Sequence, residues 1–373
     1  MSTTETPAHR RTLAESFDPR RNSLNAIRLA LAAWVIVSHS WVLSGRSSVP
    51  AGFGDQYIGD IAVDGFFAVS GFLILGSRLA SKSLLDFFWR RVLRIWPAYI
   101  VVLIFVAAVV APFAVFVLGN GRYDPLGALG YVAKNAALVV VQPGIPGSPV
   151  GIPEEGNWNA PLWTLAYEFA CYIGIAVLAT VLPRRWLAPA LAVVLAGAVA
   201  LNVVTTFTPI HLADPLIVLA RLGAFFASGS LLLAMRERIP LNAAIGIASA
   251  VVVVGLVVVQ RFDVFGGPFF AVLLLWLGIV LPLHKVGARN DISYGMYIYG
   301  YPLQLLLAIV VGSAMSSWAF ALVSIVIAVP FAMASWFLIE KPAMRWKRLT
   351  STGSFRRRSR QISDLPVADE PAI

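Results

Sequence analysis

The sequence has few charged residues and a single cysteine, and both scarcities narrow the class of protein. Only 13% of its 373 residues are charged, about half the share typical of a soluble domain. Cys171 is the only cysteine, so an intramolecular disulfide is impossible. We find no internal repeat of the kind common in transporters. No convincing cleaved signal peptide is present either, and we expect the first apolar run to be an uncleaved anchor.

Long apolar runs make up much of the chain. Hydrophobic residues make up 58% of the chain, and its mean hydropathy is +0.78. The runs are continuous and near 20 residues long, which is typical of membrane-spanning helices and not of the alternating strands of a barrel. The sequence therefore predicts an all-α, polytopic membrane bundle of about ten helices, at residues 24–43, 58–77, 96–118, 160–182, 187–205, 215–234, 241–259, 268–283, 291–311 and 318–339.

The distribution of positive charge predicts how these helices cross the membrane. With a cytoplasmic N-terminus, 23 Lys and Arg residues fall in cytoplasmic segments and only four in outer loops. This is the imbalance of the positive-inside rule, so both termini are expected in the cytoplasm. The net charge of +10 thus reflects topology, and we expect no nucleic-acid partner.

One membrane domain is expected over residues 24–345, between polar cytoplasmic tails at 1–23 and 346–373. The second tail contains "FRRRSR" at 355–360, which indicates disorder or contact with anionic lipid. The longest outer loop, 119–159, is rich in Gly and Pro and includes a possible short helix near 126–141. Loops of this length are often functional.

Two titratable residues lie in the first span. Arg28 and His39 are eleven residues apart, so on a helix they lie on nearly the same face, with a rise of about 16 Å between them. A charged side chain within a membrane is costly and indicates function by default. The alternative is a polar contact that holds helices together.

Three further ionisable residues are expected near the depth of His39. Asp64, Glu168 and Arg221 each lie six to eight residues into their spans, roughly 9–12 Å below the outer surface. A histidine beside a carboxylate is typical of general acid–base catalysis. The alternative is an ion-pair network that fixes helix packing, and either carboxylate could be the one that contacts His39.

Arginines and aromatic residues alternate in "FFWRRVLRIWPAY" at 87–99. Arg90, Arg91 and Arg94 fall on one or two adjacent helical faces at the cytoplasmic edge. They could be interface residues whose charges reach toward water. Guanidinium groups also bind phosphate well, so a phosphate-bearing cytosolic ligand is the second interpretation, and Arg28 could join the site.

In combination, these motifs resemble the membrane-bound acyltransferase-3 family. Arg28 and His39 are similar to its arginine–histidine signature, "AVDGFFAVSGFLI" at 62–74 to its second-span motif, and "FFWRRVLRIWPAY" to its third. "PLWTLAYEF" at 161–169 resembles its Trp-Ser-Leu-x-x-Glu motif. "ISYGMYIYGYP" and "FLIEKP", at 292–302 and 337–342, resemble its closing motifs. Gly300 stands where many members have a histidine.

The resemblance implies an enzyme of the bacterial cell membrane that transfers an acyl group from acyl-CoA. The donor is usually acetyl-CoA, the acceptor is a hydroxyl of an extracytoplasmic or lipid-linked carbohydrate of the cell envelope, and no metal is needed. His39 is then a base or a transient acyl carrier, oriented by Glu168 or Asp64. The expected coenzyme A contacts are Arg28, Arg90, Arg91 and Arg94, and the expected acceptor contacts are Arg221, Trp163 and Tyr297.

Two other classes fit parts of the pattern. A proton-coupled transporter could use the buried His, Asp, Glu and Arg side chains as a relay, although the missing repeats and the cytoplasmic arginine–aromatic motif count against it. A non-catalytic scaffold could keep the fold without the reaction.

Overall fold

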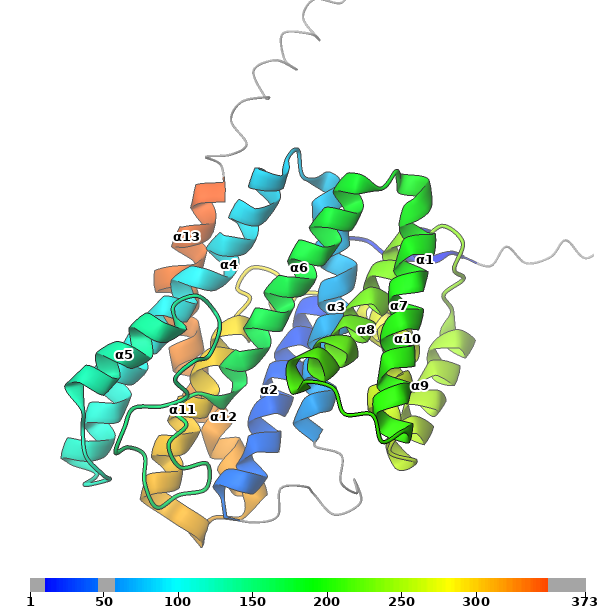
Figure 1. Ribbon diagram of the computed structural model, residues 1–373. Coiled ribbons are helices and arrows are strands. Elements are labelled where there is room, and N and C mark those ends of the chain that lie inside the picture. The colour runs from blue at the N-terminus through cyan, green and yellow to red at the C-terminus, as the bar shows by residue number, and fades with distance from the viewer. Residues whose placement is uncertain (1–10, 46–57, 348–373) are drawn as a thin grey trace, which may run out of the picture.

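The computed structural model describes residues 11–45 and 58–347, and in these residues the regular structure is helical. Figure 1 shows the helices as a bundle with most axes along one direction. The α-helices are α1 (Leu13–Ser16), α2 (Leu24–Leu43), α3 (Ile58–Ala80), α4 (Leu84–Phe105), α5 (Pro125–Asn135), α6 (Thr164–Val181), α7 (Arg184–Phe207), α8 (Asp214–Ala234), α9 (Ala243–Val258), α10 (Phe262–Val280), α11 (Ser293–Val311), α12 (Ser317–Ser335) and α13 (Lys341–Arg345).

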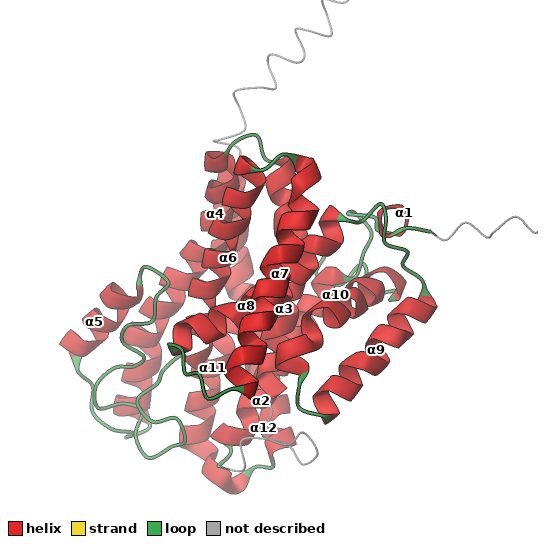
Figure 2. Ribbon diagram, turned by 45° about the vertical axis from the view of Figure 1, so that its right-hand side comes forward, coloured by secondary structure: helices red, strands yellow, loops and turns green. Residues whose placement is uncertain are grey.

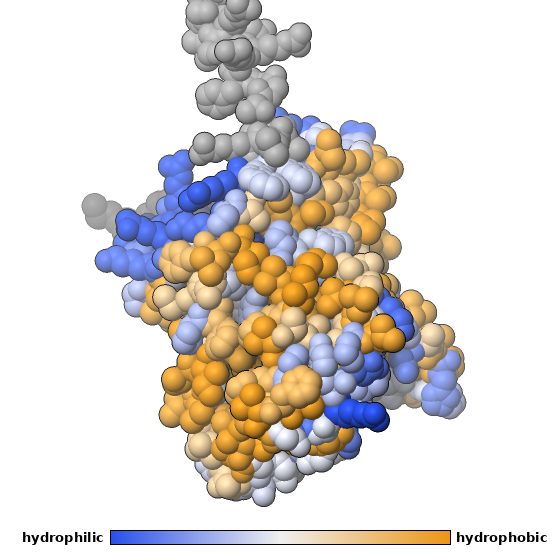
Figure 3. Space-filling model, turned by 90° about the vertical axis from the view of Figure 1, so that its left-hand side faces the viewer, coloured by the Kyte–Doolittle hydropathy of each residue, from blue (hydrophilic) through white to orange (hydrophobic). Residues whose placement is uncertain are grey.

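Nine helical segments of the described chain are long and apolar enough to cross a membrane. The tenth predicted span, 241–259, corresponds to α9, which has only 16 residues and falls short of that length. Apolar side chains cover much of the face that carries α4, α5 and α13 (Figure 3). The prediction of an all-α membrane bundle is confirmed, with nine candidate spans instead of ten.

The two ends of the bundle differ in composition. We call one the basic end, because it carries Arg78, Arg91, Arg184, Arg236 and Arg289 at or near helix ends. The opposite end, which we call the loop end, carries the segment 119–159. Helices α1 and α13 lie toward the basic end (Figure 1).

Glycine permits very close contact between α3 and α8, two of the most buried spans. A Cβ atom on Gly71 would lie 1.9 Å from the backbone oxygen of Phe226, and one on Gly229 would lie 1.9 Å from that of Ala68. The hydroxyl of Ser230 donates to the backbone oxygen of Gly71 at 3.0 Å. The Ser-Gly-Phe motif at 70–72 therefore sets how closely these two helices approach.

Helix α4 begins well before the predicted span at 96–118. Ser83 caps its first turn, and the helical segment continues through two π-helical turns to Val117, over 34 residues in all. The apolar run is shorter than this helix because the first three turns contain Arg90, Arg91 and Arg94. Arg90 and Arg94 form ion pairs inside the protein, as described below. The arginines therefore belong to a transmembrane helix and lie toward the basic end.

The loop 119–159 is held by buried amide side chains. Asn135, at the end of α5, donates to the backbone oxygen of Gln142 at 2.7 Å and accepts from the amides of Val141 and Gln142. Asn159 donates to the backbone oxygen of Ile298 at 2.9 Å. That oxygen lacks its usual helical donor because Pro302, four residues later, has no N–H. The short helix predicted near 126–141 is present but ends at Asn135.

Candidate active site

An ion-pair cluster joins α2, α4 and the start of α11 near the basic end. Arg28 contacts Asp291 at 2.8 Å, and Arg94 contacts the same carboxylate oxygen as well as Glu340 at 3.5 Å. Burial favours the neutral form of Asp291, but the two guanidinium groups outweigh it and hold the pKa of Asp291 well below its usual value. Arg28 and Arg94 are thus neutralised within the protein.

Arg91 has a different environment. Its Nη2 lies 3.5 Å from the hydroxyl of Ser77, and no carboxylate lies within ion-pair distance of it among residues 11–45 and 58–347. Its buried Nε has no hydrogen-bond partner there. A buried, uncompensated guanidinium is costly, which makes Arg91 a candidate for binding an anion.

Arg91 lines a cavity of about 270 Å³ at the basic end. Its charged lining residues are Arg91, Arg94, Arg289, Lys347 and Asp291. Burial and the neighbouring arginines lower the pKa of Lys347 to about 8. We call this the basic pocket; it has four cationic side chains against one carboxylate.

Arg90 does not line the basic pocket. Its Nε contacts Asp86 at 3.0 Å, one turn earlier on α4, and it is more exposed than Arg94. The structure therefore separates Arg90 from the other arginines that we expected to share one ligand, because consecutive residues on a helix point about 100° apart.

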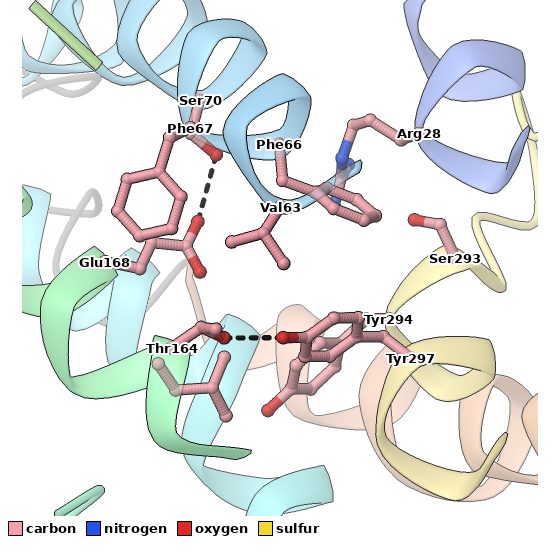
Figure 4. Close-up of a pocket in the computed structure, with 11 residues that line it drawn as sticks. Arg28, Val63, Phe66, Phe67, Ser70, Thr164, Glu168, Ser293, Tyr294 and Tyr297 are labelled. Carbon is pink, nitrogen blue, oxygen red and sulfur yellow. Dashed lines mark hydrogen bonds between the residues drawn. The ribbon is translucent and has the colours of Figure 1, made fainter. Parts of the chain in front are cut away.

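A second pocket lies deeper in the bundle, among α2, α3, α6 and α11 (Figure 4). Glu168 lines it and accepts hydrogen bonds from the hydroxyls of Ser70, at 2.9 Å, and Tyr172, at 2.5 Å. Across it, the hydroxyls of Thr164 and Tyr297 are 2.6 Å apart. We call it the central pocket; its lining residues are Arg28, Val63, Phe66, Phe67, Ser70, Thr164, Leu165, Glu168, Ser293, Tyr294 and Tyr297.

His39 lies further along α2, toward the loop end. Its ring packs edge-on against Tyr301, with the centroids 4.8 Å apart and the planes at 79°. The turn that carries it is held by Gln304, whose amide nitrogen donates to the backbone oxygen of Ile36 at 2.8 Å and to the hydroxyl of Ser40 at 3.0 Å. The predicted single helix from Arg28 to His39 is confirmed.

Gly300 is in contact with the same turn of α2. A Cβ atom on Gly300 would lie 2.8 Å from Cγ1 of Ile36. Many members of the family that this motif resembles have a histidine at this position. A histidine here would require Ile36 to move.

The predicted cluster of four groups is only partly brought together. Arg221 contacts Asp64 at 3.3 Å and Asp60 at 2.8 Å, so α3 and α8 are joined by an ion-pair network near the loop end. Glu168 instead has the two hydroxyl partners described above. Depth along the spans predicted only that these groups lie at a similar level, and it carries no information on which way each helix faces.

The other two residues expected to bind the acceptor lie near the start of α6. The ring of Trp163 packs against Tyr167, with the centroids 5.6 Å apart, and Tyr297 lines the central pocket against Phe66. Sequence reasoning missed Asp291, Ser70, Tyr172 and Tyr301. Tyr172 could have been found, because it follows Glu168 by four residues on one helix. The described residues contain no group of three His, Cys, Asp or Glu side chains arranged for a metal.

Comparison with known proteins identifies the family. The model of the acyltransferase-3 family, described as "Acyltransferase domain", matches residues 21–337. The chain belongs to this family, and it is an acyltransferase with multiple membrane-spanning helices; the predicted family and enzyme class are confirmed.

Two curated proteins are similar over nearly their whole length. An "O-acetyl transferase" of Shigella phage Sf6 is 27% identical over 338 residues, which cover 86% of this chain and 96% of the phage protein. "Nodulation protein 10" of Rhizobium leguminosarum bv. viciae is 28% identical over 354 residues, 87% of this chain and 94% of that protein. No solved structure matches the chain significantly.

Proposed function

We propose that the protein is an O-acyltransferase that moves an acetyl group from acetyl-CoA in the cytosol to a hydroxyl of an extracytoplasmic or lipid-linked carbohydrate of the bacterial envelope. The arrangement of the basic pocket, the central pocket and His39 along the bundle carries this proposal. The similarity to a phage O-acetyl transferase supports the choice of reaction.

The basic pocket suits the phosphates of the donor. Arg91, Arg289 and Lys347 line it. Arg91 and Arg289 have no carboxylate within 4.0 Å in the described chain, and guanidinium and ammonium groups bind phosphate strongly. Arg28 and Arg94 form ion pairs with Asp291. They shape the pocket but neutralise little of the negative charge of the donor phosphates. Arg90 keeps Asp86 as its partner and makes no contact with the donor. The excess of Lys and Arg in the loops at the basic end supports a cytosolic position for this pocket.

The central pocket suits the passage of the thioester arm. It begins at Arg28 and Ser293, next to the basic pocket, and reaches Thr164 and Tyr297. His39 is about 16 Å along α2 from Arg28, so an extended arm bound at the basic end can bring its thioester toward the imidazole.

His39 then activates the acceptor hydroxyl. As a base, the imidazole removes the proton of the hydroxyl while its oxygen attacks the thioester carbonyl, and the coenzyme A thiolate leaves. As a nucleophile, it would first carry the acetyl group itself. Tyr301 and Gln304 hold the ring and its turn of α2 in place. Glu168 polarises the central pocket through Ser70 and Tyr172, and Asp64 and Arg221 shape the acceptor side near the loop end.

Mass spectrometry of envelope glycans tests this function. We expect glycans from a strain without the protein to lack one acetyl group that the parent carries, and expression of the wild-type chain to restore it. Loss of a different acyl group would show that the donor is another acyl-CoA. Unchanged glycans, with substrate flux in proteoliposomes that consumes no acyl-CoA, would support transport instead.

A further inference from the structure

The N-terminal segment Arg11–Pro19, which we call the strap, lies across the basic end. The amide of Leu13 donates to the backbone oxygen of Ile239 at 2.8 Å, and that of Ala14 donates to the backbone oxygen of Arg236 at 3.0 Å. The amide of Leu241 donates in return to the backbone oxygen of Arg11 at 3.2 Å. Figure 2 shows α1, within the strap, near the end of the bundle where α9 begins. The strap is thus fixed to the turn between α8 and α9.

An apolar cavity of about 370 Å³ separates the strap from α3 and α8. One side of it is closed by Phe17, whose ring packs edge-on against Phe72 with the centroids 5.0 Å apart. Protein interiors contain few voids larger than a water molecule, and water needs polar partners that this lining scarcely offers. The lining residues are Leu13, Ala14, Phe17, Pro19, Phe72, Leu73, Gly76, Ala80, Leu233 and Arg236. Such a cavity within a membrane protein suits hydrocarbon.

The cavity is apolar in its deep part and carries a cationic side chain in its shallow part. Phe72 and Leu73 line its deep part, and Ala80, eight residues later, is the last residue of α3. That length of helix rises about 12 Å, close to the roughly 15 Å of hydrocarbon in one leaflet. Arg236 lines the shallow part, where α8 has ended, and its nearest carboxylate, on the exposed Glu237, is 4.0 Å away.

We propose that this cavity is a lipid site, in which an acyl chain of an anionic phospholipid from the cytoplasmic leaflet lies against Phe72 and its phosphate contacts Arg236. The apolar deep part and the cationic shallow part match the order of chain and headgroup in that leaflet. An anionic headgroup is favoured because the shallow part offers a guanidinium with only a weak partner, and because Arg20 and Arg21 follow the strap. Lipid in the cavity would also hold the strap, since Leu13, Ala14 and Phe17 form its wall.

Native mass spectrometry of the full chain, titrated with phosphatidylglycerol or phosphatidylcholine, tests the site. We expect one phosphatidylglycerol to bind in preference to phosphatidylcholine. Arg236→Gln should weaken that binding about fivefold, the change that corresponds to one basic residue at an anionic surface. Arg238→Gln is the matched control, because Arg238 is an exposed arginine of the same turn that does not line the cavity, and it should change nothing.

A second variant fills the cavity. A Cβ atom on Gly76 would meet only Leu233, at 3.4 Å, so Gly76→Leu can place its branched end in the space of the acyl chain and should abolish the preference. Retention of wild-type binding by Gly76→Leu, or equal binding of the two lipids, would overturn the proposal.

Hydrogen exchange of the wild-type chain gives a test that needs no variant. In nanodiscs, the amides of Leu13 and Phe17 should exchange at least fivefold more slowly with phosphatidylglycerol than with phosphatidylcholine. Equal exchange in the two lipids would contradict a lipid that holds the strap.

Discussion

At the scale of single residues, neighbouring arginines of α4 have different partners and therefore different expected roles. Arg94 is neutralised by Asp291 and Glu340, and Arg90 by Asp86, while Arg91 lines the basic pocket without a carboxylate partner in the described chain. The sequence predicted an arginine site at this edge but treated the residues as one group. It could not separate them because Asp291 approaches from a loop nearly 200 positions away.

Replacement of Arg91 tests its role in donor binding. Arg91→Ala should raise KM for acetyl-CoA roughly 10- to 100-fold, since a hydrogen bond to a charged group contributes about 1.5–3 kcal/mol. Activity at saturating donor should change little. Arg345→Ala, an exposed arginine of α13 outside the pocket, is the matched control. Unchanged donor affinity in Arg91→Ala would remove Arg91 from the phosphate site.

The pH dependence of donor binding tests Lys347. Its pKa is lowered to about 8 by burial and by nearby arginines, so its positive charge is present below pH 8 and lost as the pH rises through that value. A bound phosphate favours the charged form, so the affinity for acetyl-CoA should fall by up to about tenfold between pH 7 and pH 9. Lys347→Arg stays charged throughout and should flatten the profile; the same slope in both proteins would contradict this assignment.

The surroundings of His39 show what a single sequence leaves out at this scale. The arginine–histidine motif on α2 resembles a family signature, and this resemblance implied that the imidazole is the reactive group; that assignment stays a prediction. Its contact with Tyr301 depends on the rotation of α11 against α2, which neither helix encodes alone. Gly300 became interpretable only once Ile36 was found beside it.

At the scale of elements, hydrophobic runs predicted the helices well and their ends less well. Most spans were placed within a few residues, because about 20 apolar residues are needed to cross the bilayer. Helix α4 was cut short because its arginines interrupt the apolar run, although internal ion pairs let the helix continue. Helix α9 was counted as a span because its composition is apolar, although its 16 residues make it the shortest of the set.

The contact between α3 and α8 yields a prediction about stability. Gly71→Ala should lower the free energy of unfolding by about 1–3 kcal/mol, because its methyl group would overlap the backbone of α8 and overpacking has this cost. Thermal unfolding in detergent measures the change. Gly174→Ala on α6, where a Cβ atom meets nothing within 4 Å, should leave the midpoint unchanged or slightly raised. Equal midpoints for Gly71→Ala and the wild type would show that the helices can separate at no cost.

At the scale of the whole molecule, the proposed reaction involves both ends of one bundle. The basic pocket collects cationic side chains at one end, the central pocket continues from Arg28 into the bundle, and α2 extends on to His39 near the loop end. A transporter would use the same buried charged residues as a proton relay. Many of these residues instead form ion pairs within the protein: Arg221 with Asp60 and Asp64, and Arg28 with Asp291. Membership of an acyltransferase family supports an enzyme rather than a transporter.

Acetyl transfer across sealed membrane vesicles measures whether the bundle carries an acetyl group from a cytosolic donor to an acceptor on the other side. Labelled acetyl-CoA would be added outside inverted vesicles, which expose the cytoplasmic face, and the label would be measured on glycans enclosed inside. We expect enclosed label with the wild-type chain, none with His39→Ala at equal protein level, and none in right-side-out vesicles. Equal labelling by His39→Ala, or labelling in right-side-out vesicles, would contradict transfer from a cytosolic donor through this bundle.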